Sequence, residues 1–231
     1  MSAAEPLNVK ACVFDAYGTL FDVAAAAQHC SAELGDIWQP FAALWRQKQL
    51  QYTWLRGLMG RHADFWQVTG DALDFTMTSF RVANDDLRRR LMDLYMNLDA
   101  YPEVPEVLRK LKQAGKRCAI LSNGTPGMVE AAVRNAGIGE YIDGIYSVEA
   151  VGVYKPHPAV YALATRELAL PARDISFQSS NAWDAYAAKA FGYRTVWINR
   201  FDQARERLPG EPDHEINNLA GLPAVLGVSG P

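Results

Sequence analysis

Short apolar runs alternate along this chain with segments of helical periodicity, and this alternation restricts the fold more than any other feature. The apolar runs span residues 11–16, 117–123, 144–149, 174–179 and 194–199. Between them, apolar residues recur at three- and four-residue steps, as at Val104, Val107 and Leu108. Strands that alternate with helices are typical of a parallel sheet with crossover helices. The sequence therefore predicts an α/β protein.

The region from 23 to 98 interrupts this alternation. It contains several helical stretches, such as 41–59, and no convincing strand. We therefore expect a Rossmann-like parallel sheet core, formed by residues 1–22 and 99–231, with a helical cap subdomain, residues 23–98, inserted after the first strand. Ligands of open α/β sheets bind beyond the carboxyl ends of the strands, so a cap in this place would cover the ligand site.

The predicted helix 41–59 carries two apolar faces. The first face consists of Phe41, Leu44, Trp45, Tyr52, Leu55 and Met59. The second consists of Arg46, Leu50 and Trp54, spaced by four residues. A helix that is apolar on two sides is covered on two sides, here by its own subdomain and by the core. Arg46 would then face the cleft between them; an ordinary surface arginine is the alternative.

Polar residues follow the predicted strands at the points where the strands end. They are Asp15 and Thr19, Ser122 and Asn123, Lys155, and finally Ser179, Asn181, Trp183 and Asp184. Singly, such residues are mostly turn formers or helix caps. Together at one edge of a sheet, an acid, a hydroxyl, an amide, a lysine and a second acid predict an active site.

The motifs that contain these residues resemble those of the haloacid dehalogenase superfamily. They read "DAYGTL", "LSNG", "KP" and "SSNAWD". Members of that superfamily use the aspartate after the first strand as a nucleophile. The stretches "FDAYGTLFDV" and "RQKQLQYTWLR" are similar to the narrower L-2-haloacid dehalogenase family, and the second lies in the cap, where superfamily members differ most.

Tyr17 separates this chain from most of that superfamily. The magnesium-dependent phosphatases carry a second acid at this place, which protonates the leaving alkoxide and helps to hold the metal. A hard cation needs several oxygen ligands, and Asp15 and Asp184 beside Lys155 form a poor magnesium site. A halide leaves as a stable anion and needs neither the acid nor the metal. We therefore expect no metal and no cofactor.

The resemblance implies that short L-2-haloalkanoic acids are hydrolysed to D-2-hydroxy acids through an aspartyl ester, with inversion at C2. Asp15 would attack C2, and Lys155 would keep it ionised in place of a metal. Thr19 would fix the angle of the Asp15 carboxylate. Asp184 would orient or deprotonate the water of the second step, with Ser179 and Asn181 positioning that water.

The substrate contacts also follow from the resemblance. Ser122 would take the substrate carboxylate, while Arg46, Asn123 and Trp183 would surround the departing halide. The remaining positions of the family's pocket correspond to Tyr17, Gln47, Leu50, Phe65 and Tyr161. Plain core packing is an equally good interpretation of Phe65 and Tyr161. The sequence does not define the substrate chain length or whether fluoride can leave.

Several residues near these motifs predict local structure only. Gln178 is a buried amide that must find a hydrogen bond and could shift the turn that contains Ser179. His157 is interpreted as a helix-start residue and Asp22 as the cap of the first cap helix. The tail from 209 predicts a loop, a short helix and a frayed end.

Composition and charge exclude several classes of function. The net charge of −3 gives no reason to expect a nucleic acid or an anionic membrane as partner. No apolar run approaches the ~20 residues that span a bilayer, and residues 1–10 lack the features of a secretory signal. Cys12, Cys30 and Cys118 have no metal-like spacing and suit a reducing compartment. We predict a soluble cytoplasmic protein.

Two other functions and one assembly state remain open at this point. A metal-dependent phosphatase acting on a small phosphate monoester is the main alternative, and Tyr17 argues against it. A catalytically inactive module that binds small carboxylates is the other, and it leaves Asp15, Lys155 and Asp184 together unexplained. The family resemblance implies a homodimer whose ligands are the haloacid substrate and the halide product.

Overall fold

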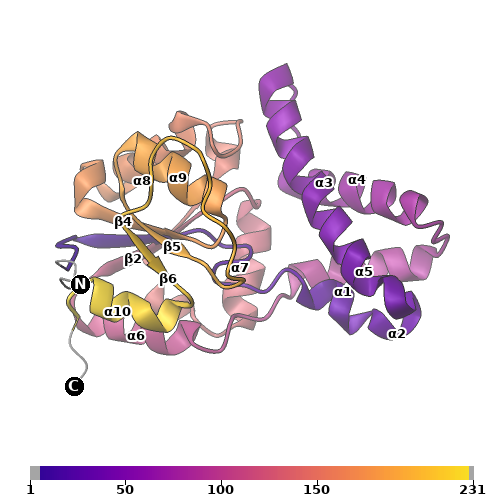
Figure 1. The fold of residues 1–231 in the computed structure, drawn as a ribbon, viewed down its shortest axis with the longest axis horizontal. Helices are drawn as coiled ribbons and strands as arrows, with labels where there is room; N and C mark the ends of the chain where they lie inside the picture. The colour runs from indigo at the N-terminus through magenta and orange to yellow at the C-terminus, as the bar shows by residue number, and fades with distance from the viewer. Residues whose placement is uncertain (1–5, 229–231) are drawn as a thin grey trace.

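The computed structural model describes residues 6–228, and its core is a six-stranded sheet. The strands are β1 (Ala11–Phe14), β2 (Arg117–Ser122), β3 (Gly144–Ser147), β4 (Ile175–Ser179), β5 (Arg194–Ile198) and β6 (His214–Ile216). Their order is β3-β2-β1-β4-β5-β6, and every neighbouring pair is parallel (Figure 1). The predicted α/β fold with a parallel sheet is confirmed.

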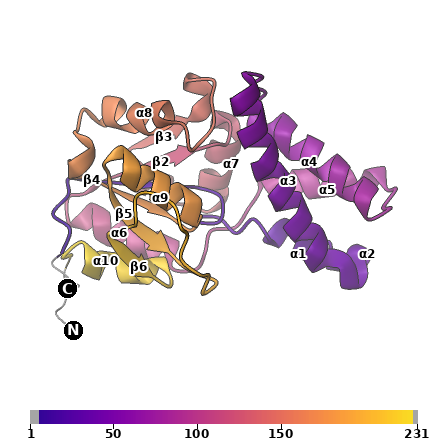
Figure 2. The same ribbon diagram turned by 45° about the horizontal axis from the view of Figure 1, so that its top comes forward.

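The central strand β1 explains why the sheet is parallel and buried. All of its residues have no exposed surface, because helices cover both faces of the sheet. The core helices are α6 (Val104–Gln113), α7 (Pro126–Asn135), α8 (Pro158–Leu168), α9 (Ala182–Phe191) and α10 (Leu222–Val225). Helices α8 and α9 lie on one face of the sheet and α6 and α10 on the other (Figures 1 and 2).

Successive strands are added to the sheet on two opposite sides of β1. From β1 the sheet continues to β2 and β3 on one side, and to β4, β5 and β6 on the other. Crevices at such a switch in strand order, beyond the carboxyl ends of the strands, bind ligands in open α/β sheets. The residues directly after β1 and β4 therefore lie at the expected place for a site.

A helical segment follows β1 before the chain returns to the sheet, as predicted. It contains α1 (Ala25–His29), α2 (Ser31–Leu34), α3 (Trp38–Met59), α4 (Phe65–Ser79) and α5 (Asp85–Met96), followed by α6 of the core. Helices α1–α5 stand apart from the sheet as a cap, whereas α6 packs against β2 (Figure 1).

Two chain segments join the cap to the core, and they are hydrogen-bonded to each other. Asp22 N donates to Asp99 O at 3.0 Å, and Tyr101 N donates to Leu20 O, also at 3.0 Å. Phe21 and Ala100 form an antiparallel bridge between these contacts. The outgoing and returning segments therefore make one two-stranded connection.

Three local predictions were wrong in part. Residues 214–216 form β6, a strand that the sequence analysis placed in a loop; they pair with β5 at the edge of the sheet. Asp22 does not cap α1, whose N-cap is Ala24; its Oδ1 instead accepts a hydrogen bond from Ala24 N at 2.9 Å. In contrast, His157 begins α8 as predicted, and its Nδ1 accepts from Ala159 N.

The third error concerns the first face of α3. Its buried residues are Phe41, Trp45, Gln49 and Thr53. Leu55 and Met59 are 45% and 69% exposed, because this end of α3 projects beyond the other cap helices (Figure 1). Within residues 6–228, no helix combines the length and apolar character that crossing a membrane requires.

Candidate active site

Asp15 stands directly after β1, at the centre of the sheet edge. Its backbone N–H continues the sheet by donating to Gln178 O at 2.9 Å, and its side chain is buried. Gly18 has φ +88°, which residues with a side chain rarely adopt, and it allows the chain to turn back at once. The turn brings Thr19 Oγ1 to 3.1 Å from Asp15 Oδ2, to which it donates.

Four side chains donate hydrogen bonds to the Asp15 carboxylate. Lys155 Nζ lies 2.9 Å from Oδ1. Asn181 Nδ2, Thr19 Oγ1 and Ser179 Oγ lie 2.8, 3.1 and 3.3 Å from Oδ2. Such donors favour the ionised carboxylate and hold its plane in one orientation.

Lys155 links the two acids of the site. Its ammonium group also lies 2.8 Å from Asp184 Oδ2, and all three side chains are buried. Burial opposes the charge on Lys155, but the two carboxylates outweigh it and raise the pKa of Lys155 above its usual value. Lys155 therefore remains an ammonium ion at neutral pH.

Asp184 is held from its other side by Tyr161. The Tyr161 hydroxyl donates to Asp184 Oδ1 at 2.7 Å. Burial raises the pKa of Asp184 above its usual value, although Lys155 and the Tyr161 hydroxyl both lower it. Burial and the nearby Asp184 also raise the pKa of Tyr161, so its hydroxyl keeps its proton and remains a donor.

The cap supplies one cation to this edge of the core. Arg46 of α3 donates through Nη2 to Tyr17 O at 3.4 Å and to Asn181 Oδ1 at 3.3 Å. Its Nη1 donates to Gln49 Oε1 at 2.7 Å, and Gln49 is itself hydrogen-bonded to Tyr95 Oη. The prediction that Arg46 faces the cleft between cap and core is confirmed by these contacts.

A small cavity with a volume of about 10 Å³ lies between these groups; residues of the cap cover it, and it is named the closed cavity for that reason. Its walls are formed by Asp15, Tyr17, Arg46, Leu50, Phe65, Asn123, Lys155, Asn181 and Trp183. A space of this size holds about one water molecule. A larger ligand therefore requires the cap to move away from the core.

Tyr17 occupies the position at which magnesium-dependent phosphatases of the superfamily that the motifs resemble carry a second acid. Its ring stacks on Tyr95 with 5.5 Å between centroids, and its hydroxyl is buried with no hydrogen-bond partner among residues 6–228. Gly124 leaves the room for this ring, because a Cβ there would lie 2.7 Å from Tyr17 Cε2. Burial raises the pKa of Tyr17 well above its usual value, so the hydroxyl keeps its proton and remains a donor, and Tyr17 is one of the residues that line the cavity.

The side chains at the ends of β2 and β4 order the turns there through hydrogen bonds. Ser122 Oγ is buried and accepts from Gly124 N at 3.0 Å, which orders the turn after β2. Asn123 Oδ1 accepts from Lys155 N at 3.0 Å and so ties that turn to the loop of the lysine. Ser179 Oγ donates to Asp15 while accepting from Asn181 N at 3.2 Å.

Gln178 does not displace this last turn. Its Nε2 donates to Ser176 Oγ within β4, while its Oε1 has no partner in the described part of the chain. Because Gln178 remains in register with Phe14 of β1, Ser179 still reaches Asp15.

Three of the predicted substrate contacts, Ser122, Gln47 and Tyr161, do not line the closed cavity, and two side chains that were not predicted support the site. Gln47 is exposed on α3 and does not line the closed cavity. Gln49 and Tyr95, which sequence reasoning missed, are buried and hold Arg46 and Tyr17 in place. The signal in the sequence was the three-residue step from Arg46 to Gln49, which places them on one helical face.

The donor set does not fit a divalent cation. Among residues 6–228, no cluster of three or more histidine, cysteine, aspartate or glutamate side chains could hold a metal ion. The Lys155 ammonium bridges Asp15 and Asp184, which are the two acids a cation would need.

Comparisons with known proteins agree with this geometry. A model of the haloacid dehalogenase-like hydrolase family matches residues 9–192. The chain is 44% identical over 219 residues to (S)-2-haloacid dehalogenase 1 of Pseudomonas sp. (strain CBS-3), covering 94% of this chain and 96% of that protein. It is 45% identical over 215 residues to (S)-2-haloacid dehalogenase of Pseudomonas sp. (strain YL), covering 93% of each.

A solved structure extends the likeness to three dimensions. L-2-haloacid dehalogenase from Xanthobacter autotrophicus, with chloropropionic acid covalently bound, superimposes with a TM-score of 0.89 at 35% identity. The match covers 96% of this chain and 100% of that one.

Proposed function

Because the chain belongs to the haloacid dehalogenase-like hydrolase family, we propose that it is an (S)-2-haloacid dehalogenase, a hydrolase acting on carbon–halide bonds. It converts L-2-haloalkanoic acids to D-2-hydroxy acids. The observation that carries this proposal is the buried Asp15–Lys155 pair at 2.9 Å, with Tyr17 where a phosphatase needs its second acid.

In the first step, an Asp15 carboxylate oxygen attacks C2 from the side opposite the halogen. The new C–O bond forms an aspartyl ester, and the carbon–halogen bond breaks with its electron pair on the halide. Thr19, Ser179 and Asn181 fix the direction of attack through their hydrogen bonds to Oδ2. One displacement at carbon inverts C2.

The substrate and the halide are held by groups around the closed cavity. Arg46, Asn123 and Trp183 present positive electrostatic potential to the halide. Ser122 and the backbone amides of its turn take the substrate carboxylate, and the unpartnered Tyr17 hydroxyl adds a donor. Leu50 and Phe65 supply the apolar wall.

In the second step, water attacks the carbonyl carbon of the Asp15 ester. Asp184 accepts a proton from that water, and Lys155 stabilises the negative charge that develops on the ester oxygens. The bond between the Asp15 carbonyl carbon and the ester oxygen breaks, and Asp184 returns the proton to that oxygen. The C2–O bond remains intact, so the hydroxy acid leaves with an oxygen from Asp15. The oxygen of water stays in the regenerated carboxylate.

The deciding experiment measures halide release from L- and D-2-chloropropionate in the presence of EDTA. We expect release from the L isomer only. Release from neither isomer would exclude a dehalogenase. Turnover of a phosphate monoester that requires Mg²⁺ would instead support the phosphatase alternative, which the Tyr17 side chain argues against.

The organisation and assembly of the enzyme complete the proposal. We assign residues 23–98 to the cap subdomain and residues 1–22 and 99–231 to the core domain, because the hydrogen-bonded connection between Leu20 and Tyr101 separates them. The enzyme works as a homodimer in the cytoplasm, where its buried, unpaired cysteines stay reduced. It needs no cofactor and no nucleic-acid or membrane partner.

A further inference from the structure

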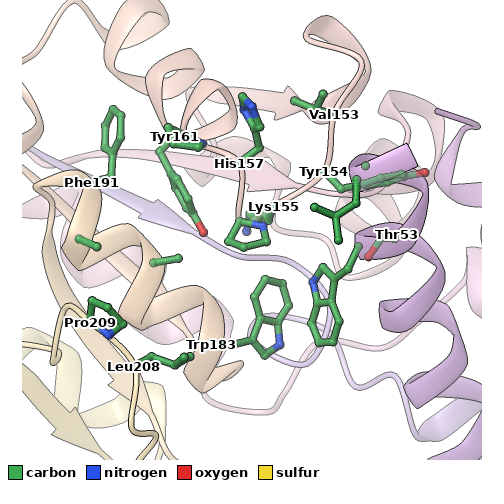
Figure 3. A pocket seen from close by; sticks show the side chains of 17 residues that line it. Thr53, Val153, Tyr154, Lys155, His157, Tyr161, Trp183, Phe191, Leu208 and Pro209 are labelled. Carbon is green, nitrogen blue, oxygen red and sulfur yellow. The ribbon is translucent and has the colours of Figure 1, made fainter. Parts of the chain in front are cut away.

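A second cavity, of about 850 Å³, lies beside the closed one (Figure 3). It is bordered by the end of α3, the loop 153–158, α9 and the segment 208–209. Its large apolar side chains include Trp54, Leu58, Trp183 and Phe191. Cavities of 300 to 1,000 Å³ with mostly apolar walls are typical of small-molecule sites.

Two residues belong to the walls of both cavities. Lys155 and Trp183 line the 10 Å³ cavity on one side and the 850 Å³ cavity on the other. Trp54 of the cap meets Trp183 edge to face, with 5.4 Å between ring centroids. The two indole rings therefore form a contact between the cap and the core, and a movement of the cap would separate them.

Most polar groups in the wall of the larger cavity are already engaged; within residues 6–228 the exceptions are the indole N–H groups of Trp54 and Trp183 and the Nε2 atom of His157, whose Nδ1 accepts from Ala159 N. Lys155 is paired with two acids, and the Tyr161 hydroxyl donates to Asp184. Thr53 Oγ1 donates to Leu50 O, and the Tyr154 hydroxyl donates to Ala63 O. The surface that remains for an occupant is mostly apolar, which favours a hydrocarbon over a polar or charged ligand.

We propose that this cavity, hereafter the tail cavity, binds the alkyl chain of 2-haloacids that are longer than chloropropionate. The inference rests on the proposed function. When the cap has moved, the carboxylate, C2 and the halogen lie among the residues that line the closed cavity, and the chain from C3 outward passes Trp183 into the tail cavity. Each methylene buried there raises kcat/KM about fourfold until the cavity is filled.

Ala187 provides a way to fill the tail cavity without touching the catalytic groups. It lies one helical turn after Trp183 on α9, and it lines the tail cavity but not the closed one. Ala187→Leu therefore shortens the space for an alkyl chain. Ala131→Leu on α7 is the matched control, because this alanine is also partly buried and lines neither cavity.

The test measures kcat/KM for L-2-bromo acids from three to eight carbons with the wild type and both variants. We expect the wild type to prefer the longer acids. Ala187→Leu should lower kcat/KM for 2-bromooctanoate at least tenfold while leaving 2-bromopropionate within twofold, and Ala131→Leu should change neither.

The proposal fails if the wild type hydrolyses 2-bromopropionate but not the longer acids, or if Ala187→Leu affects all chain lengths equally. It also fails if Ala187→Leu alters only the oligomeric state, measured by analytical ultracentrifugation, since the cavity would then be a contact between subunits. A wild type that releases no bromide from any of these acids would refute the proposed function itself.

Discussion

The Lys155 ammonium lies 2.9 Å from Asp15 Oδ1, and the two side chains are 1% and 8% exposed. A buried charge that loses its partner is strongly destabilising, whereas the pair itself can be close to neutral for stability. In the proposed mechanism the same contact orients the Asp15 carboxylate for attack at carbon. The predictions below test this pair and the groups around it.

Replacing Lys155 by methionine should remove both effects of the ammonium group. We expect activity to fall by about 10³-fold and the free energy of unfolding to fall by about 3–5 kcal/mol, because Asp15 and Asp184 are left buried without a counter-charge. Halide release and urea unfolding measure the two effects. Lys112→Met, which breaks a more exposed pair with Asp143, should change stability by less than about 1 kcal/mol. A Lys155→Met enzyme with near-normal activity would contradict the mechanism.

The aspartyl ester can be detected by isotope transfer. In a single turnover in oxygen-18 water, with enzyme in excess, we expect the label in the Asp15 carboxylate and not in the hydroxy acid. Mass spectrometry of the peptide that contains Asp15 measures it. Asp15→Asn should abolish turnover, whereas Asp22→Asn, whose side chain only closes a turn at Ala24, should not. Label that appears first in the hydroxy acid would mean that water attacks C2 directly.

Tyr161→Phe should change the pH profile in one direction. The Tyr161 hydroxyl bonds to the ionised form of Asp184 at 2.7 Å and lowers the pKa of that acid, so its loss should raise the pKa further. Because Asp184 acts as a carboxylate, we expect the acid limb of the kcat profile to move to higher pH. Tyr186→Phe changes another tyrosine, on the helix α9 that carries Asp184, and should leave the pH profile unchanged. An acid limb that stays in place or moves down would exclude this role.

Arg46→Ala should impair halide departure without unfolding the protein. We expect kcat to fall by about 10²-fold or more and inhibition by added bromide to weaken. Gln49 keeps its hydrogen bonds to Thr69 and Tyr95, so the free energy of unfolding should change by about 1 kcal/mol or less. Arg56→Ala removes another arginine of α3, one paired with Asp71, and should leave kcat intact. Equal losses in both variants would assign Arg46 a purely structural role.

Metal removal should have no effect on turnover. The two acids that could bind a cation are bridged by Lys155, so we expect rates within about twofold with EDTA or with added Mg²⁺. A magnesium-dependent phosphatase assayed in parallel shows that the chelator works. A dependence on Mg²⁺ would require Lys155 to move away from Asp15 and Asp184.

The central strands of the sheet could be predicted because they are buried on both faces. Ala11–Phe14 and Ile175–Ser179 are continuous buried segments, and runs of this kind can be recognised in a sequence. Strand β6 could not be predicted, because Glu215 is exposed, His214 and Ile216 are only partly buried, and the strand is ordered by pairing with β5. Its backbone hydrogen bonds leave no periodic signal in the side chains.

The grouping of the core side chains at the candidate site follows from the parallel sheet, which brings the residues after β1 and β4 together. The cap contribution is harder to predict, because it depends on how α3 is rotated against the core. Arg46 and Gln49 share the inner face, whereas Gln47 is exposed. A one-residue error in helical phase turns a side chain by about 100°.

The outgoing and returning segments between cap and core are hydrogen-bonded to each other between Leu20 and Tyr101, so the cap is covalently joined to the core through one paired connection. Arg46 belongs to the cap and Asp15 follows a strand of the sheet. In the proposed mechanism, a cap that opens to admit a new acid would therefore also draw Arg46 away from Asp15. Expulsion of the spent halide and entry of the next molecule would then be two results of one mechanical event.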